Sequence, residues 1–156
     1  MTRGAGPVPV GAQGPGGPSP AVQTPERTQS ARPQVSQSIT MAGDASSVRE
    51  ARQLVANAME RLPTRLRDAV VLLAHEVVTN AVVHGGGWFF LELSSTEDRV
   101  RVEVTDTSGS VPRVFRTSQA REHGRGMAIV DALASEWGVD GNGTHKTVWF
   151  ELSLSP

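Results

Sequence analysis

The sequence contains no cysteine. This absence excludes disulfide bonds, thiolate metal sites and a cysteine nucleophile, and it is typical of proteins from a reducing compartment. The four histidines, His75, His84, His123 and His145, do not have the spacing of a zinc site. We therefore expect no metal centre built on cysteine or imidazole ligands.

Long apolar runs and an excess of either charge are also missing. No segment approaches the ~20 apolar residues of a membrane-spanning helix, and the N-terminal stretch lacks the continuous apolar core of a signal peptide. The 15 Lys and Arg nearly balance the 16 Asp and Glu, so no overall field attracts nucleic acid or an anionic membrane. We expect a cytoplasmic protein with no direct nucleic-acid or membrane binding, which recognises its partners through local contacts.

Glycine, proline, serine and glutamine crowd the N-terminal segment. Residues 1–32 offer scarcely a large apolar side chain to offset the entropy of ordering, which predicts a disordered tail. A passive extension is the simpler interpretation of this tail, and a docking segment is the alternative. Residues 33–155 have the patterning of one domain, and 156 residues are too few for two ordinary cores.

Periodicity and turn residues predict the order of elements in this domain. A capping-box sequence, Ser47-Val48-Arg49-Glu50, predicts the start of the first helix. The expected elements are an edge strand over 33–41, helices over 47–61 and 64–84, strands over 88–94 and 99–106, a loop over 107–125, a helix over 127–136, and strands over 137–139 and 146–154. This order predicts an α+β fold with a mixed, mostly antiparallel sheet and helices layered on one face.

Two polar residues interrupt the apolar face of the second expected helix. Glu76 and Asn80 are one helical turn apart near its C-terminal end, within the stripe formed by Leu73, Val77 and Ala81. Burying a carboxylate and a carboxamide there costs several kcal/mol unless both groups are paired. A metal and a polar ligand would pair with them. Alternatively, both lie at the margin of the stripe and bond to water or to a neighbouring loop.

An acidic residue ends one of the expected strands with inward parity. Asp106 continues the alternation of three valines, so its carboxylate points toward the face that the helices cover. An acid in that position needs a hydrogen-bond donor, and an adenine amino group is one candidate. The alternative is an aspartate that caps the following turn through Ser108 or Gly109.

Glycines stand where the long loop meets the last expected helix. Gly124 and Gly126 flank Arg125, where free backbone N–H groups and the positive end of the helix dipole favour an anion such as phosphate. Such glycine pairs are common before helices, and their spacing is not that of the dinucleotide fingerprint. Lys146 and Thr147 open the last strand and offer a cation and a hydroxyl near the same end of the sheet.

Three motifs, in this order, resemble the nucleotide-binding motifs of the GHKL ATPase superfamily. They are Glu76-Val-Val-Thr-Asn80-Ala, Asp106-Thr-Ser-Gly109 and Gly124-Arg-Gly126-Met-Ala-Ile-Val130. The superfamily includes gyrase, a class of heat-shock chaperones, histidine kinases and MutL, and the resemblance covers about residues 33–154. The chain most resembles the short anti-sigma-factor serine kinases of the RsbW and SpoIIAB type. This resemblance implies a Bergerat-type ATP-binding fold, a two-layer α/β sandwich.

The resemblance implies a role for each matching residue. Asn80 corresponds to the asparagine that ligates the phosphate-bridging Mg²⁺, and Glu76 to the general base. Asp106 corresponds to the aspartate that reads adenine, and Thr147 to a threonine near it. The remaining nucleotide-binding residues implied by the motifs are Gly109, Gly124, Arg125, Gly126 and Met127. One departure is that serine, as Ser108 and Ser110, replaces both glycines of the usual Asp-x-Gly-x-Gly motif.

The resemblance implies a regulatory protein that uses ATP and Mg²⁺. The leading interpretation is a serine/threonine protein kinase that also sequesters a sigma factor. It would phosphorylate an anti-sigma antagonist protein of the STAS type. The alternative is a non-catalytic module in which ATP orders the loop over 107–125 for a transcription-regulator partner. The catalytic part of a histidine kinase is disfavoured, because we expect no helical hairpin with a phosphoacceptor histidine before the domain. Homodimerisation through the sheet stays open.

Overall fold

The computed structural model describes residues 34–108 and 125–155. Within these ranges the chain forms five strands and three helices. In chain order they are β1 (Val35–Ala42), α1 (Ala45–Ala58), α2 (Thr64–His84), β2 (Trp88–Ser95), β3 (Arg99–Asp106), α3 (Arg125–Leu133), β4 (Glu136–Gly141) and β5 (Lys146–Ser153). The expected tail and most of the expected long loop lie outside the described residues.

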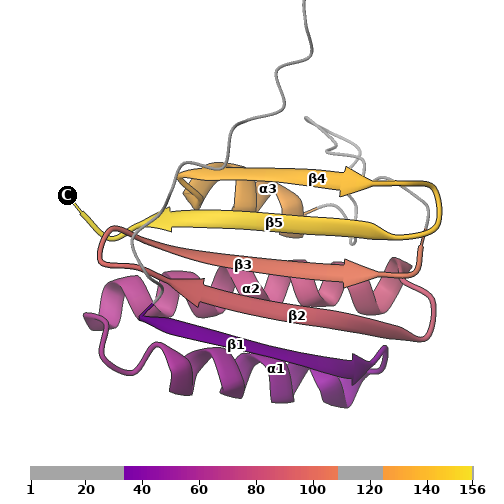
Figure 1. Cartoon of the computed structure of the whole chain (residues 1–156), viewed down its shortest axis with the longest axis horizontal. Coiled ribbons are helices and arrows are strands. Elements are labelled where there is room, and N and C mark those ends of the chain that lie inside the picture. Colours follow the sequence, from indigo (N-terminus) through magenta and orange to yellow (C-terminus); the bar gives the residue numbers. More distant parts are fainter. Residues whose placement is uncertain (1–33, 109–124, 156) are drawn as a thin grey trace, which may run out of the picture.

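The five strands form one sheet in the order β1-β2-β3-β5-β4 (Figure 1). All four pairings are antiparallel, although we expected a mixed sheet. The predicted edge strand is confirmed, since β1 pairs with β2 alone. The register places Asp106 opposite Lys146, which brings the end of β3 to the start of β5.

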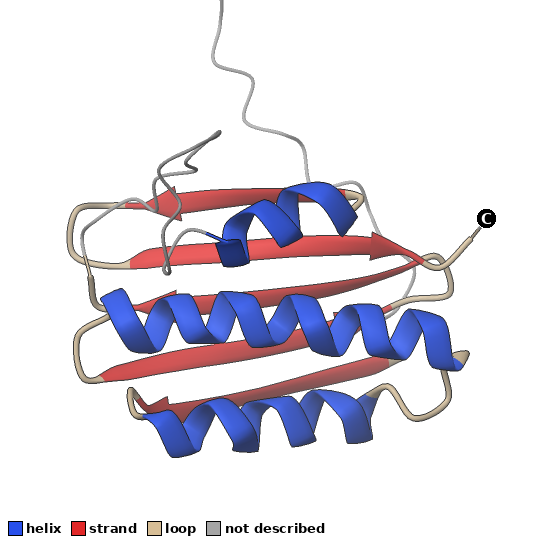
Figure 2. Cartoon of the chain, turned by 180° about the vertical axis from the view of Figure 1, so that it is seen from behind, coloured by secondary structure: helices blue, strands red, loops and turns tan. Residues whose placement is uncertain are grey.

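All three helices pack on the same face of the sheet. Figure 2 shows α2 crossing the middle of the sheet, with α1 over β1 on one side and α3 toward β4 on the other. The buried core lies between these two layers, and alternate residues of β2, β3 and β5 supply its sheet side. The predicted two-layer α+β sandwich is therefore confirmed.

The start of α1 differs from the expected capping box. The N-cap is Asp44, whose Oδ1 accepts hydrogen bonds from the backbone N–H groups of Ser46 and Ser47 at 2.9 and 3.1 Å. Ser47 lies inside the first turn and is buried, so it cannot cap the helix. The prediction that Ser47 begins the helix is wrong because an aspartate three residues earlier already satisfies the exposed backbone donors.

The bounds predicted for α2 are confirmed. Pro63 is its N-cap residue and has no backbone N–H to leave unsatisfied, and Gly85 is its C-cap. No helix within residues 34–108 and 125–155 is long and apolar enough to cross a membrane.

The sheet face opposite the helices carries polar contacts between neighbouring strands. Arg101 forms ion pairs with Glu103 and Glu151, and its guanidinium carbon lies 4.1 Å from the centroid of the Trp149 ring. Burial alone lowers the pKa of Arg101, but hydrogen bonds and charge from Glu103 and then Glu151 outweigh it, so the pKa is raised. Arg101 therefore stays charged and ties three strand positions together.

Candidate nucleotide-binding site

Most of the predicted site residues that the structure describes come together at one end of the sheet. This end is formed by the last turns of α2, the end of β3, the start of α3 and the start of β5. Glu76 and Asn80 come from α2, Asp106 from β3 and Gly126 from α3. Gly109 and Gly124, two further predicted site residues, lie outside the described residues.

Asp106 is buried, as its strand parity predicted. Its Oδ1 accepts two hydrogen bonds from Ser108, one from the backbone N–H at 2.8 Å and one from the hydroxyl at 2.6 Å. Its Oδ2 has no hydrogen-bond partner among the described residues. The turn-capping role and a ligand-binding role are therefore compatible, because they use different oxygens of one carboxylate.

Lys146 lies beside this aspartate. The sequence analysis noted its cation near this end of the sheet but did not count Lys146 among the nucleotide-binding residues. Its Nζ is 3.2 Å from Asp106 Oδ2, within ion-pair distance but outside hydrogen-bond geometry, and its side chain is 2% exposed. A signal was present in the sequence, since Lys146 continues the inward alternation of Val148 and Phe150. The Lys146 side chain therefore lies on the face of the sheet that the helices cover.

Thr147, the residue expected beside the aspartate, lies on the opposite face of the sheet. It pairs in register with Thr105, and their Oγ1 atoms are 2.7 Å apart. Successive residues of a strand point to opposite faces, so Thr147 and Lys146 cannot both face Asp106. The structure therefore does not bring the Thr147 side chain together with the other predicted site residues.

Glu76 lies directly against the start of α3. A Cβ added at Gly126 would meet Glu76 Oε2 at 2.5 Å, closer than side-chain atoms approach one another. Glycine therefore permits the Glu76 carboxylate to lie this close to the backbone of α3. The carboxylate of Glu76 and the first turn of α3 are thus neighbours.

Asn80 lies one turn further along α2 and is partly buried. Its Nδ2 is buried and has no hydrogen-bond partner among the described residues. The same is true of His75 Nδ1 and Thr79 Oγ1 on the same helix. Buried polar atoms without partners are uncommon, so Asn80 Nδ2 and Asp106 Oδ2 are two positions at which a polar ligand would supply the missing hydrogen bond.

Backbone packing holds the end of α2 close to Asp106. A Cβ added at Gly85 would lie 2.2 Å from the Ala81 carbonyl oxygen and 3.0 Å from Asp106 Cβ.

Arg125 is exposed at the first position of α3, whereas the Met127 side chain is buried in the core. Of these two predicted residues, Arg125 alone offers its side chain to a ligand, and Met127 offers its backbone.

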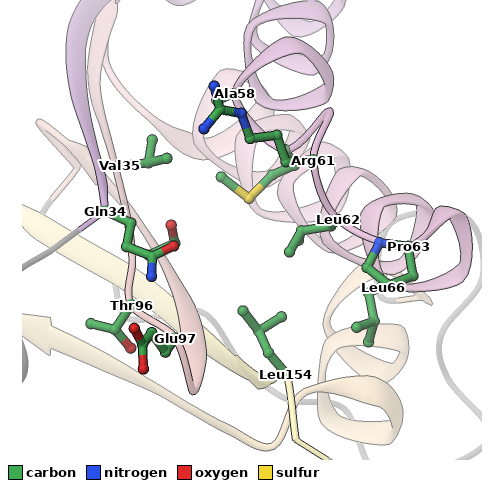
Figure 3. Close-up of a pocket in the computed structure, with 12 residues that line it drawn as sticks. Gln34, Val35, Ala58, Arg61, Leu62, Pro63, Leu66, Thr96, Glu97 and Leu154 are labelled. Carbon is green, nitrogen blue, oxygen red and sulfur yellow. The ribbon is translucent and has the colours of Figure 1, made fainter.

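A separate cavity of about 400 Å³ lies at the other end of the sheet. Its lining comes from the connection between α1 and α2, the start of β1 and the turn between β2 and β3 (Figure 3). The apolar members include Val35, Leu62, Leu66 and Leu154. None of the predicted site residues lines it, so this cavity is distinct from the candidate site.

The residues present fit a magnesium-bound adenine nucleotide. Asp106 Oδ2 makes an ion pair with Lys146 but accepts no hydrogen bond from the described residues, so it can accept one from an amino group. Gly126 lets the Glu76 carboxylate lie against the start of α3, where backbone N–H groups favour an anion. No cluster of three or more acidic, histidine or cysteine side chains exists within the described ranges. If Mg²⁺ is bound with the nucleotide, the Asn80 side-chain oxygen is the group on α2 that would ligate it together with phosphate oxygens.

Comparison with known proteins agrees with this geometry. No curated protein matches the chain. Among solved structures, it is similar to the RsbU and RsbW domains of Rv1364c from Mycobacterium tuberculosis, with a TM-score of 0.57 and 19% sequence identity over 76% of this chain. This chain spans 32% of that structure, and the similarity extends to the fold alone. The histidine kinase-like ATPase domain family matches residues 41–152, well over half of the sequence. The chain therefore belongs to the histidine kinase-like ATPase family.

Proposed function

We propose that this protein is a serine/threonine protein kinase of the anti-sigma type that uses Mg-ATP to phosphorylate a STAS-type antagonist protein. The observation that carries the proposal is the contact between the Glu76 carboxylate and Gly126 at the start of α3. It sets a base against the helix end where phosphate groups are expected. Membership of an ATPase family supports nucleotide binding, and similarity to a structure that contains an RsbW domain supports the regulatory class.

Each residue has a defined task in this proposal. Asp106 Oδ2 accepts a hydrogen bond from the adenine amino group, and Asn80 supplies an oxygen ligand to the cation. When bound, Mg²⁺ would neutralise charge on the phosphate oxygens. Glu76 accepts the proton of the antagonist's serine or threonine hydroxyl, whose oxygen bonds to the γ-phosphorus as the bond to ADP breaks. The products are ADP and a phosphorylated antagonist.

Substitution of the proposed base tests the kinase assignment. Glu76→Gln should reduce transfer of labelled phosphate to a candidate antagonist by about 10²-fold or more, while Mg-ATP binding changes little. Glu50→Gln, an exposed carboxylate on α1, is the matched control and should transfer at the wild-type rate. Transfer by Glu76→Gln at the wild-type rate would remove Glu76 as the base.

A non-catalytic, ATP-responsive binding module is the second candidate. Serine at position 108 favours it, because the Ser108 hydroxyl and backbone N–H both bind Asp106 where the family pattern has glycine. This candidate predicts that partner binding depends on nucleotide while no phosphate is transferred or released. Capture of partners from the native host with and without ATP, followed by a transfer assay on the captured proteins, separates the two candidates. We expect a sigma factor and a STAS-type protein among them.

A further inference from the structure

Lys146 and Asp106 form an ion pair deep in the candidate site. The two side chains are 2% and 1% exposed, and Nζ lies 3.2 Å from Oδ2. Removing both charges from water carries a large desolvation cost, and the pair recovers it only when further hydrogen bonds satisfy the remaining donors and lone pairs. Within the described residues this condition is not met, because Oδ2 has no hydrogen-bond partner.

The remaining capacity of the pair is one acceptor next to one cationic donor. Ser108 uses Oδ1 for two hydrogen bonds, which leaves Oδ2 open. An ammonium has three N–H donors, and the part of the chain that the structure describes gives it one ionic partner. An acceptor and a donor side by side match a ligand edge that carries a donor beside an acceptor.

The hydrogen-bonding edge of adenine has this pattern, with the 6-amino group as the donor and ring N1 as the adjacent acceptor. We propose that Lys146 is a second base-reading residue, which donates a hydrogen bond to adenine N1 while Asp106 Oδ2 accepts one from the 6-amino group. This assignment rests on the proposed binding of adenine nucleotide, but it does not require phosphate transfer. It also gives a reason for burying a lysine at this position of β5.

The assignment makes a specific statement about ligand chemistry. In 1-deaza-ATP a C–H group replaces ring N1, which deletes the acceptor for Lys146 and keeps the amino group for Asp106. A hydrogen bond to a charged group contributes enough that wild-type protein should bind 1-deaza-ATP about tenfold more weakly than ATP. In Lys146→Met the donor is gone, so the two nucleotides should bind with equal affinity.

The experiment is a binding cycle measured by calorimetry on the whole chain, with Mg-ATP and Mg-1-deaza-ATP as titrants. Arg99→Met is the matched control, because it removes a positive charge from the far end of β3. It should keep the tenfold preference of the wild type. General damage to the pocket by Lys146→Met would weaken both nucleotides together and leave their ratio unchanged, so the ratio separates base reading from structural support.

The possible outcomes decide the assignment. A wild-type protein that binds both nucleotides equally overturns it even if Lys146→Met does not fold, and so does a tenfold preference that persists in Lys146→Met. If the unpaired Asp106 unfolds that variant, the wild-type ratio decides alone, and about tenfold weaker binding of 1-deaza-ATP supports the assignment. Folded wild-type protein that binds neither nucleotide overturns the proposed function as well, whereas absent phosphate transfer alone leaves the Lys146 assignment standing.

Discussion

Gly126 lies against the carboxylate of Glu76. The atom that an added Cβ would meet is Oε2, the far end of a flexible side chain, while Glu76 Cβ lies at an ordinary 3.5 Å. A methyl group at position 126 can therefore be accommodated by moving the carboxylate. The fold should tolerate the change, and the position of the proposed base should not.

This geometry predicts that Gly126→Ala affects activity much more than stability. Alanine favours helix over glycine, so the free energy of unfolding should fall by no more than about 0.5 kcal/mol or should rise. Phosphate transfer should decrease at least tenfold, because the displaced carboxylate no longer meets the hydroxyl. Urea unfolding and a transfer assay measure the two effects, with Ala132→Ser on the exposed side of α3 as the control. Unchanged transfer would show that the Glu76 position is not critical.

Residue-level prediction from the sequence succeeded where one pattern fixed one direction. The alternation in β3 placed Asp106 inward, and helical spacing placed Glu76 and Asn80 on one side of α2. The choice of Thr147 over Lys146 followed the motif instead of the alternation of β5. A shift of one residue moves a side chain to the other face of a sheet. The prediction therefore named Thr147, whose hydroxyl lies on the outer face, in place of Lys146, whose cation is buried beside Asp106.

Among the elements, α1 depends on a cap that the sequence interpretation did not identify. The hydrogen bond from the Ser46 hydroxyl, followed by that from the Ser47 backbone N–H, lowers the pKa of Asp44 below its ordinary value of 3.8. Because the pKa of Asp44 is lower in the folded state, the ionised cap stabilises the fold fully at pH values above the unfolded-state pKa. This stabilisation is lost as the pH falls through the lower pKa of the folded state.

Asp44→Ala should therefore lower the Tm by a few degrees at neutral pH. The difference from wild type should narrow when the pH is lowered from neutral to a value at which the wild-type cap is protonated, below the lowered pKa of Asp44. Glu50→Ala is the control, because it removes the acidic member of the expected capping box and should leave the start of α1 unaffected. Circular dichroism melts at the two pH values measure both variants. A larger decrease in Tm for Glu50→Ala than for Asp44→Ala would show that the capping box from Ser47 to Glu50, and not Asp44, stabilises the start of α1.

Element bounds were predictable where backbone chemistry is restrictive. Proline lacks an N–H and glycine ends helices readily, so Pro63 and Gly85 fixed both ends of α2. No proline or glycine directly follows residue 58, where α1 ends, and the predicted end at residue 61 was three residues too far along the chain. Two capping candidates lie close together at its start, and local spacing did not rank Asp44 above Ser47.

At the scale of the whole molecule, alternating strands and amphipathic helices predicted a two-layer sandwich without fixing the order of its strands. Placing β5 between β3 and β4 depends on pairings between residues far apart in the sequence, which no local pattern contains. That order puts Lys146 beside Asp106, and so it determines the composition of the site. The cavity at the far end of the sheet was not predicted, because its lining comes from separate connections.

The central claim is that this end of the sandwich binds Mg-ATP, and calorimetric titration of the folded, full-length chain tests it most directly. The account predicts saturable binding of one Mg-ATP per chain. A nucleotide concentration of about 100 times Kd should also raise the Tm by on the order of 10 °C. Absence of both binding heat and a thermal shift at millimolar Mg-ATP, in protein that circular dichroism shows to be folded, would contradict it.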